Sequence, residues 1–125
     1  MTWYQRKANK YGAKKTIFEG RKYDSKGEAG LAQEISLLEK SGQVVKVEPQ
    51  KTFGLLGRNG GRICGHRVDF LLTFKDGTQE VWEYKGFATE IWRLKRMLFE
   101  DNYPEIKYVV ITAKGNWFRN RMFKN

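Results

Sequence analysis

The segment at residues 106–112, Ile-Lys-Tyr-Val-Val-Ile-Thr, constrains the fold of this chain more than any other part of the sequence. Its apolar and β-branched residues predict a strand in the interior of a sheet. A helix is expected just before it, from a cap at Thr89 to about Asn102, because Tyr103-Pro104 stops it. A strand before that helix would run parallel to the strand at 106–112, so the sheet is expected to be mixed.

Three extended segments precede that helix and predict an antiparallel meander. Residues 44–56 are expected to form one strand with Pro49 at an edge or a bulge, and residues 63–74 and 79–86 the next two. The turns between them carry Asn-Gly at 59–60 and Lys-Asp-Gly-Thr at 75–78, which suit tight hairpins.

Two further elements are expected nearer the start of the chain. Residues 15–25 predict a short hairpin with Glu-Gly at its turn. Asp24 or Ser25 can then cap a helix over about residues 25–41, which Ser-Gly at 41–42 ends. The predicted fold class is therefore α/β: one domain, with a mixed sheet flanked by helices in the order helix, three strands, helix, strand. A length of 125 residues leaves no room for a second core.

The positive charge of the chain is concentrated at its two ends. The net charge is +10, and residues 1–22 and 113–125 account for all of it. Aromatic residues are interspersed in both ends. Basic segments with stacking side chains suit a polyanion, usually nucleic acid, although such ends can also serve only to keep a small protein soluble. Residues 1–15 and 113–125 are expected to lie outside the core or to pack on a partner.

The scarcity of cysteine and histidine excludes several classes of site. Cys64 alone cannot form an internal disulfide framework, and His66 alone cannot build a multi-histidine metal site within one chain. No run of about eighteen apolar residues could span a membrane, and residues 1–12 contain no apolar stretch typical of a signal peptide. These features favour a reducing, cytoplasmic setting and no membrane partner.

Charged residues inside predicted strands are the strongest functional signal. Asp69 stands in an apolar strand, while Glu83 and Lys85 share one face of the next. Because a short hairpin joins the two strands, Asp69 and Glu83 can come close together, where their repulsion favours a divalent cation between them. Lys85 can then neutralise an attacking hydroxide or a phosphate in the transition state. The alternative is an ordinary cross-strand ion pair on a solvated face.

Glu28 is the expected fourth member of this group. At about one hundred degrees per residue it lies within the apolar stripe of the first helix, whereas Glu34 falls at the margin of that stripe and is expected to be solvated. The stripe consists of Leu31, Ala32 and Ile35. An acid in this position is either functional or a helix N-terminal acid that the helix dipole favours.

His66 and Lys95 each have two possible roles. His66 is expected on the strand face opposite Asp69, either as a phosphate or proton-transfer group or as a structural histidine. Lys95 falls in the apolar sector of the second helix, so it either snorkels to solvent or points at the site. That sector is expected to contain Ile91, Trp92, Leu94, Leu98 and Phe99, with Arg93, Arg96 and Glu100 opposite. The candidate DNA-binding residues are Arg21, Lys22, Lys26, Arg58, Arg62, Lys95, Arg119 and Arg121.

At these positions the chain resembles the PD-(D/E)XK nuclease superfamily. That superfamily has a restriction-endonuclease-like α-βββ-α-β core with a helix Glu, a strand Asp and a Glu-x-Lys triplet, and Glu28, Asp69, Glu83 and Lys85 match in order. Within it, the chain is similar to small phage proteins of unknown function and to the endonuclease I family of phage Holliday-junction resolvases. Residues 69–72, 83–86 and 103–105 carry the latter likeness, and Val68 replaces the proline that the family name denotes.

The resemblance implies a metal-dependent phage endonuclease that hydrolyses DNA phosphodiester bonds. It implies Mg²⁺ or Mn²⁺ held by Asp69, Glu83 and the backbone carbonyl of Tyr84, with Glu28 completing the shell and Lys85 positioning the attacking water. It also implies branched DNA as substrate and, for the resolvases, a homodimer. The alternatives are a nickase, an end- or flap-processing nuclease, or a non-catalytic DNA-binding module of the same fold.

Overall fold

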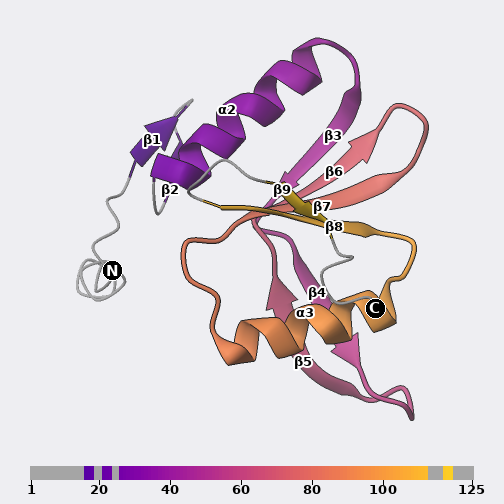
Figure 1. Ribbon diagram of the computed structural model, residues 1–125. Helices are drawn as coiled ribbons and strands as arrows, with labels where there is room; N and C mark the ends of the chain where they lie inside the picture. Colours follow the sequence, from indigo (N-terminus) through magenta and orange to yellow (C-terminus); the bar gives the residue numbers. More distant parts are fainter. Residues whose placement is uncertain (1–15, 19–20, 24–25, 113–116, 120–125) are drawn as a thin grey trace.

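The computed structural model describes residues 16–18, 21–23, 26–112 and 117–119 (Figure 1). A five-stranded mixed sheet forms its centre, with the strand order β3-β6-β7-β8-β9. Only β7 and β8 run parallel, and the other neighbours are antiparallel. The elements in chain order are β1 Thr16–Phe18, β2 Arg21–Tyr23, α2 Lys26–Lys40, β3 Val44–Pro49, β4 Thr52–Leu56, β5 Arg62–Arg67, β6 Phe70–Phe74, β7 Gln79–Tyr84, α3 Glu90–Asn102, β8 Lys107–Ile111 and β9 Trp117–Arg119.

The predicted α/β class and element order are confirmed. Helix α3 connects β7 to β8, and this crossover makes the two strands parallel. Thr89 caps α3 as expected, since its side-chain oxygen accepts a hydrogen bond from the Trp92 backbone N–H. Strand β8 lies inside the sheet between β7 and β9. The predicted hairpin near the start is present as β1 paired with β2, while its turn at 19–20 lies outside the described residues.

Helices α2 and α3 lie on opposite faces of the sheet (Figure 1). Alternate residues of β8 therefore face different helices: Val109 and Ile111 pack with α2, and Tyr108 and Val110 with α3. The same alternation along β7 directs Trp82 towards α2 and Val81 towards α3. The sheet therefore lies between two apolar layers, one under each helix. Neither described helix is long and apolar enough to cross a membrane.

A sharp bend divides the two long strands that the sequence predicted at 44–56 and 63–74. Strand β3 pairs with β6 in the central sheet, but β4 pairs with β5 as a separate hairpin. The bend lies at Gln50–Lys51 and, opposite, at Val68–Asp69. The Gln50 N–H donates to the Asp69 carbonyl at 2.8 Å, and the Val68 N–H donates to the Lys51 carbonyl at 2.8 Å. Gln50 has a φ of 55°, a left-handed conformation that redirects the chain. Asp69 therefore stands at a bend and not, as predicted, inside a strand.

The apolar face predicted for α3 is wrong in part. Trp92 and Phe99 are buried as expected, but Ile91 and Leu94 are exposed by about 62% and 58%. Arg96, which was expected on the solvent side, is fully buried. The helix is turned so that its core-facing stripe follows Trp92, Arg96 and Phe99, which lie three to four residues apart.

The basic end of the chain is not wholly outside the fold. Residues 117–119 form β9, the edge strand that pairs with β8, so the prediction that residues 113–125 lie outside the core is wrong for this strand. Residues 1–15 and 120–125, including Arg121, lie outside the described residues. For Arg21, Lys22 and Arg119 only the backbone is described.

Candidate active site

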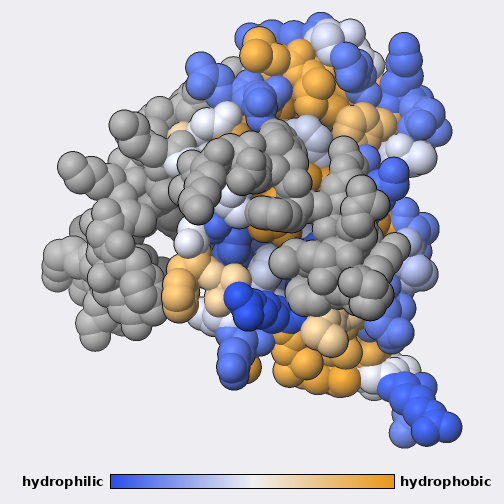
Figure 2. Space-filling model, in the orientation of Figure 1, coloured by the Kyte–Doolittle hydropathy of each residue, from blue (hydrophilic) through white to orange (hydrophobic). Residues whose placement is uncertain are grey.

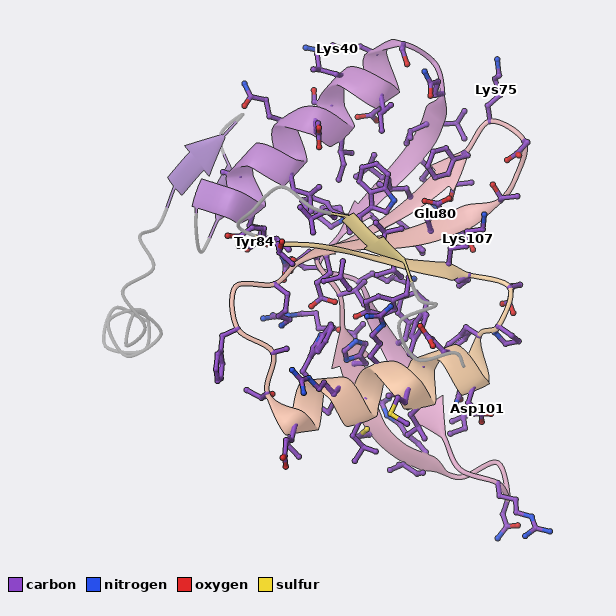
Figure 3. All side chains as sticks on the ribbon, viewed as in Figure 1. Lys40, Lys75, Glu80, Tyr84, Asp101 and Lys107 are labelled. Carbon is purple, nitrogen blue, oxygen red and sulfur yellow. The ribbon has the colours of Figure 1, made fainter. Side chains whose placement is uncertain are left out.

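Three elements converge at one end of the sheet: the first turn of α2, the bend between β5 and β6, and the end of β7. Figure 3 labels Tyr84 at this end, beside the start of α2, while Lys75 and Lys107 lie at the opposite end. The convergence brings together the carboxyl groups of Glu28, Asp69 and Glu83, whose charges interact. The helix, strand and triplet positions predicted from the sequence therefore meet in space.

The surroundings of Asp69 strongly perturb its carboxyl group. The Tyr84 backbone N–H donates a hydrogen bond to its Oδ2 at 2.9 Å, which fixes the carboxyl group against the end of β7. Burial, followed by the carboxylates of Glu83 and Glu28, raises the pKa of Asp69 to about 8. The Tyr84 N–H and Lys85 oppose this rise but do not cancel it. Asp69 therefore holds a proton at neutral pH unless a cation reduces the repulsion.

Glu83 is buried on the α3 side of β7, where it meets charged and hydroxyl groups. Its Oε2 lies 3.6 Å from Lys85 Nζ, and its Oε1 accepts a short hydrogen bond from the Tyr108 hydroxyl. Burial raises the pKa of Glu83, while Lys85, Tyr108 and Trp92 act against that rise. The ordinary Glu–Lys ion pair is thus present, but in a buried setting and not on a solvated sheet face.

Lys85 follows the last residue of β7 and stands at the edge of the site. Its side chain is 25% exposed, and its Nζ lies 4.9 Å from the centre of the Trp92 ring. The aromatic face can hold the ammonium group by a cation–π contact while leaving its other side open. An ammonium group held in this way can contact an anion that enters from solvent.

Glu28 occupies the first turn of α2 and is buried, as the helical spacing predicted. Its Oε2 accepts a hydrogen bond from Gln50 Nε2 at 3.0 Å, so the residue that forms the bend also fixes the glutamate. The neighbouring Gly27 allows a close approach, because a Cβ there would lie 2.1 Å from the Tyr84 ring. Glu34 and Glu39 are exposed, in agreement with the expectation that Glu28 alone enters the interior.

A buried chain of hydrogen bonds from His66 through Tyr108 reaches Glu83 on the α3 side of the sheet. His66 Nε2 lies 2.7 Å from the Tyr108 hydroxyl, which in turn donates to Glu83. Burial, then the charges of Lys95 and Lys85, lowers the pKa of His66 to about 4, so its ring is neutral at pH 7. The bend removes the simple strand alternation that placed His66 away from the site. The histidine is buried and hydrogen-bonded, which fits the interpretation of His66 as a structural residue.

Two cationic residues of α3 face the same region. Arg96 lies with its guanidinium carbon 4.8 Å from the Tyr108 ring centre, and its Nε is 3.3 Å from Glu100 Oε2. Burial lowers the pKa of Arg96, and the nearby Glu100, Tyr108 and Glu83 oppose this. Lys95 is half-buried and acts electrostatically on His66, so it points towards the site side of the helix.

The sequence analysis did not identify Tyr108, Gln50 or Gly27 as parts of the site. Tyr108 was expected only as a residue of a buried strand, and no local pattern marks a tyrosine that bonds a glutamate on the neighbouring strand. The one signal in the sequence for a buried polar group near Tyr108 was Arg96. It stands between Trp92 and Phe99 at helical spacing, so it can lie on the buried face of the helix.

The predicted DNA-binding residues do not all reach the carboxylates. Arg58 and Arg62 are exposed on the β4–β5 hairpin, which extends past α3 on the side away from α2 (Figure 1). The side chain of Lys26 is outside the described part. A hollow of about 480 Å³ at the other end of the sheet contains none of the four site residues and is lined by both acids and bases, among them Lys75, Glu80, Glu105 and Lys107.

The donor set fits a hard divalent cation in a partial shell. Carboxylate oxygens that raise one another's pKa are stabilised when a cation lies between them, and Mg²⁺ usually binds one or two carboxylates while keeping several waters. Among the described residues, no group of three or more Asp, Glu, His or Cys side chains is arranged so that it could hold a metal ion. Asp69 and Glu83 would therefore hold such an ion with water as the remaining ligand, while the charge of Glu28 acts on Asp69 from the first turn of α2.

Comparison with known proteins gives a family but no function. No curated protein and no solved structure matches the sequence. A family model described as "Protein of unknown function (DUF1064)" matches residues 8–117, which include every described site residue. The chain therefore belongs to the DUF1064 family.

Proposed function

We propose that this protein is a metal-dependent endonuclease that hydrolyses DNA phosphodiester bonds and belongs to the PD-(D/E)XK superfamily. The observation that carries the proposal is the convergence of Asp69, Glu83 and Lys85 with the helix acid Glu28 at the end of one sheet. Structural ion pairs rarely need three mutually repelling carboxylates, whereas metal-assisted phosphoryl chemistry does. The order of elements that contributes them is that of the superfamily core.

Each residue has a distinct role in this proposal. Asp69 and Glu83, with the Tyr84 carbonyl and Glu28, would hold Mg²⁺ or Mn²⁺, and the ion would supply an activated water and positive charge beside the phosphate. Lys85, held between Glu83 and the Trp92 ring, orients the attacking water and opposes charge that develops on the phosphoryl oxygens. Tyr108 and Arg96 keep Glu83 in place from the α3 side.

We further propose branched DNA, such as a Holliday junction, as the substrate and a homodimer as the acting form. The net charge of +10 supports a polyanionic substrate. The outer face of α3 exposes Ile91, Leu94 and Met97 by about 62%, 58% and 50%, which suits a second copy of the chain. A phage-encoded enzyme of this kind would act in the host cytoplasm.

Cleavage assays test the proposal directly. The protein is incubated with Mg²⁺ on four-way junction, flap, single-stranded and linear DNA, and again with EDTA. We expect metal-dependent cleavage, greatest on the junction, and a loss of at least about a hundredfold in Asp69→Asn with DNA binding in Ca²⁺ retained. Cleavage of flaps or nicking of linear DNA alone would identify the alternative nucleases. Binding without any cleavage would instead identify a non-catalytic DNA-binding module.

A further inference from the structure

The β4–β5 hairpin is a rigid arm with one covered and one open face. Its inner face packs Phe53 and Leu55 into the layer beneath α3. The last turn of α3 fixes it further: the Tyr103 hydroxyl donates to the Gly54 carbonyl at 2.8 Å, and Asn102 bonds both the N–H and the carbonyl of Leu56. The arm is therefore held in one orientation before any ligand arrives.

The outer face of the arm carries positive charge without acids. Residues 51–67 contain four basic side chains and no Asp or Glu. Lys51 pairs with Glu48 at 3.4 Å, so its charge is compensated. Arg58, Arg62 and Arg67 are exposed, and within the described part of the chain none of them forms an ion pair.

The middle of the outer face is flat because two glycines are paired there. Gly54 lies opposite Gly65, beside the exposed pair of Thr52 and Arg67. The Arg62 side chain folds over these glycines, since a Cβ at Gly65 would lie 2.6 Å from its Nη2 and a Cβ at Gly54 would lie 3.9 Å from its Nε. The missing side chains leave space that the Arg62 side chain fills, so its guanidinium group lies close over the strand pair and is presented from a flat surface.

The arm also starts at the candidate active site. Strand β5 ends at Arg67, two residues before Asp69, and its six residues span about 20 Å towards the tip. That length corresponds to about six base pairs along a duplex. Figure 2 shows the hydrophilic tip projecting from the lower right of the molecule, where Figure 1 places the end of the hairpin.

We propose that the outer face of the β4–β5 hairpin binds the phosphate backbone of duplex DNA next to the bond that is cut. The choice of DNA as the polyanion rests on the proposed function. Exposed Leu56 and Ile63 near the tip would also suit a protein partner. A protein surface does not explain an arm with three exposed arginines that form no ion pair among the described residues, no acid, and a pair of facing glycines.

Binding experiments with matched charge removal test this arm. Arg58→Ala/Arg67→Ala removes two charges from the arm, and Lys40→Ala/Lys75→Ala removes two from exposed positions that Figure 3 shows away from it. Affinity for a linear duplex is measured in Ca²⁺ over a range of salt concentrations, with thermal midpoints as the check on folding. We expect the arm variant to bind at least about fivefold more weakly, with a salt slope smaller by about 2, and the control to keep the slope.

A third variant changes the shape of the outer face without changing its charge. Gly65→Ala leaves the net charge unchanged but forces the Arg62 guanidinium off the facing glycines, so it should also weaken duplex binding. Wild-type affinity and slope in the arm variant would overturn the proposal, as would loss of self-association without a change in DNA binding. The outcome is independent of cleavage. A smaller salt slope in the arm variant of a protein that cuts no DNA would support the proposal for the arm and refute the proposed nuclease activity. Cleavage with unchanged slopes would refute only the arm.

Discussion

Replacing Asp69 by asparagine should stabilise the metal-free protein, although the same change is expected to abolish the proposed DNA cleavage. The reason is the raised pKa of this residue, which reports that the folded state disfavours its ionised form. In the unfolded chain the carboxyl group returns to its ordinary pKa of 3.8. Below that pH both states are protonated, and Asp69 costs nothing. As the pH rises from about 4 to 8 the unfolded state ionises first, and the wild type loses stability over this window.

The size of the stability difference follows from the same pH range. At pH 7 the group lies roughly three pH units above its unfolded pKa, which sets a ceiling of about 4 kcal/mol at about 1.4 kcal/mol per unit. Relaxation around the carboxyl group reduces this cost, so we expect Asp69→Asn to gain at least about 1 kcal/mol. In a chain of this length that gain raises the thermal midpoint by about 3–6 °C. The asparagine carbonyl can still accept the Tyr84 N–H.

Thermal unfolding in EDTA between pH 5 and 9 measures this effect. The advantage of Asp69→Asn should grow with pH and level off above about 8, and Mg²⁺ should stabilise the wild type but not the variant. Asp76→Asn is the control of opposite sign, because hydrogen bonds from Thr78 lower the pKa of this exposed turn residue. A pH-independent difference between wild type and Asp69→Asn, or a less stable variant at pH 8, would refute the reasoning.

Three further changes test the surroundings of the site. Glu28→Gln should keep the fold and lose most Mg²⁺-dependent cleavage, whereas Glu34→Gln should behave like wild type; full activity in both would remove Glu28 from the site. Tyr108→Phe keeps the ring but deletes the hydroxyl between histidine and glutamate, so Mn²⁺ affinity by calorimetry should fall about tenfold to a hundredfold, and unchanged affinity would contradict the supporting role. Gly27→Ala should destabilise by about 1–3 kcal/mol through collision with the β7 tyrosine, while Gly30→Ala, with open space around it, should stabilise by up to about 1 kcal/mol in thermal melts.

The order of the elements could be predicted because local signals and the fold agree. Turn glycines, the cap at Thr89 and the apolar strand at 106–112 each have a local physical cause, and the structure contains all of them. The bend at Gln50 has no such signal, because a left-handed conformation is typical of glycine or asparagine and not of glutamine. It persists because Gln50 donates hydrogen bonds from its backbone N–H to the Asp69 carbonyl and from its side-chain amide to the Glu28 carboxylate.

The burial of Arg96 could not be predicted for a different reason. A helical projection weighs Ile91 and Leu94 as core residues and an arginine as surface, since charged side chains are almost never fully buried alone. Here the partners lie on other turns and other elements: Glu100 supplies the charge, and the Tyr108 and Trp92 rings supply stacking surfaces. Only the packed sheet brings these groups together, so the sequence pattern points to the wrong face.

Tyr84 shows why the spacing of the charged residues succeeded even though the bend was missed. As the middle residue of Glu-x-Lys it has no charge, yet its backbone N–H holds Asp69 and its ring packs on Gly27, next to Glu28. One residue thus ties the bend and the helix to the strand that carries Glu83 and Lys85. A signature that records only the charged positions is sufficient to predict that these residues converge, because the residue between Glu83 and Lys85 joins them in the fold. The geometry of the site, however, depends on that neighbour: a Cβ at Gly27 would collide with the Tyr84 ring and push Glu28 away from the strand without altering any of the charges.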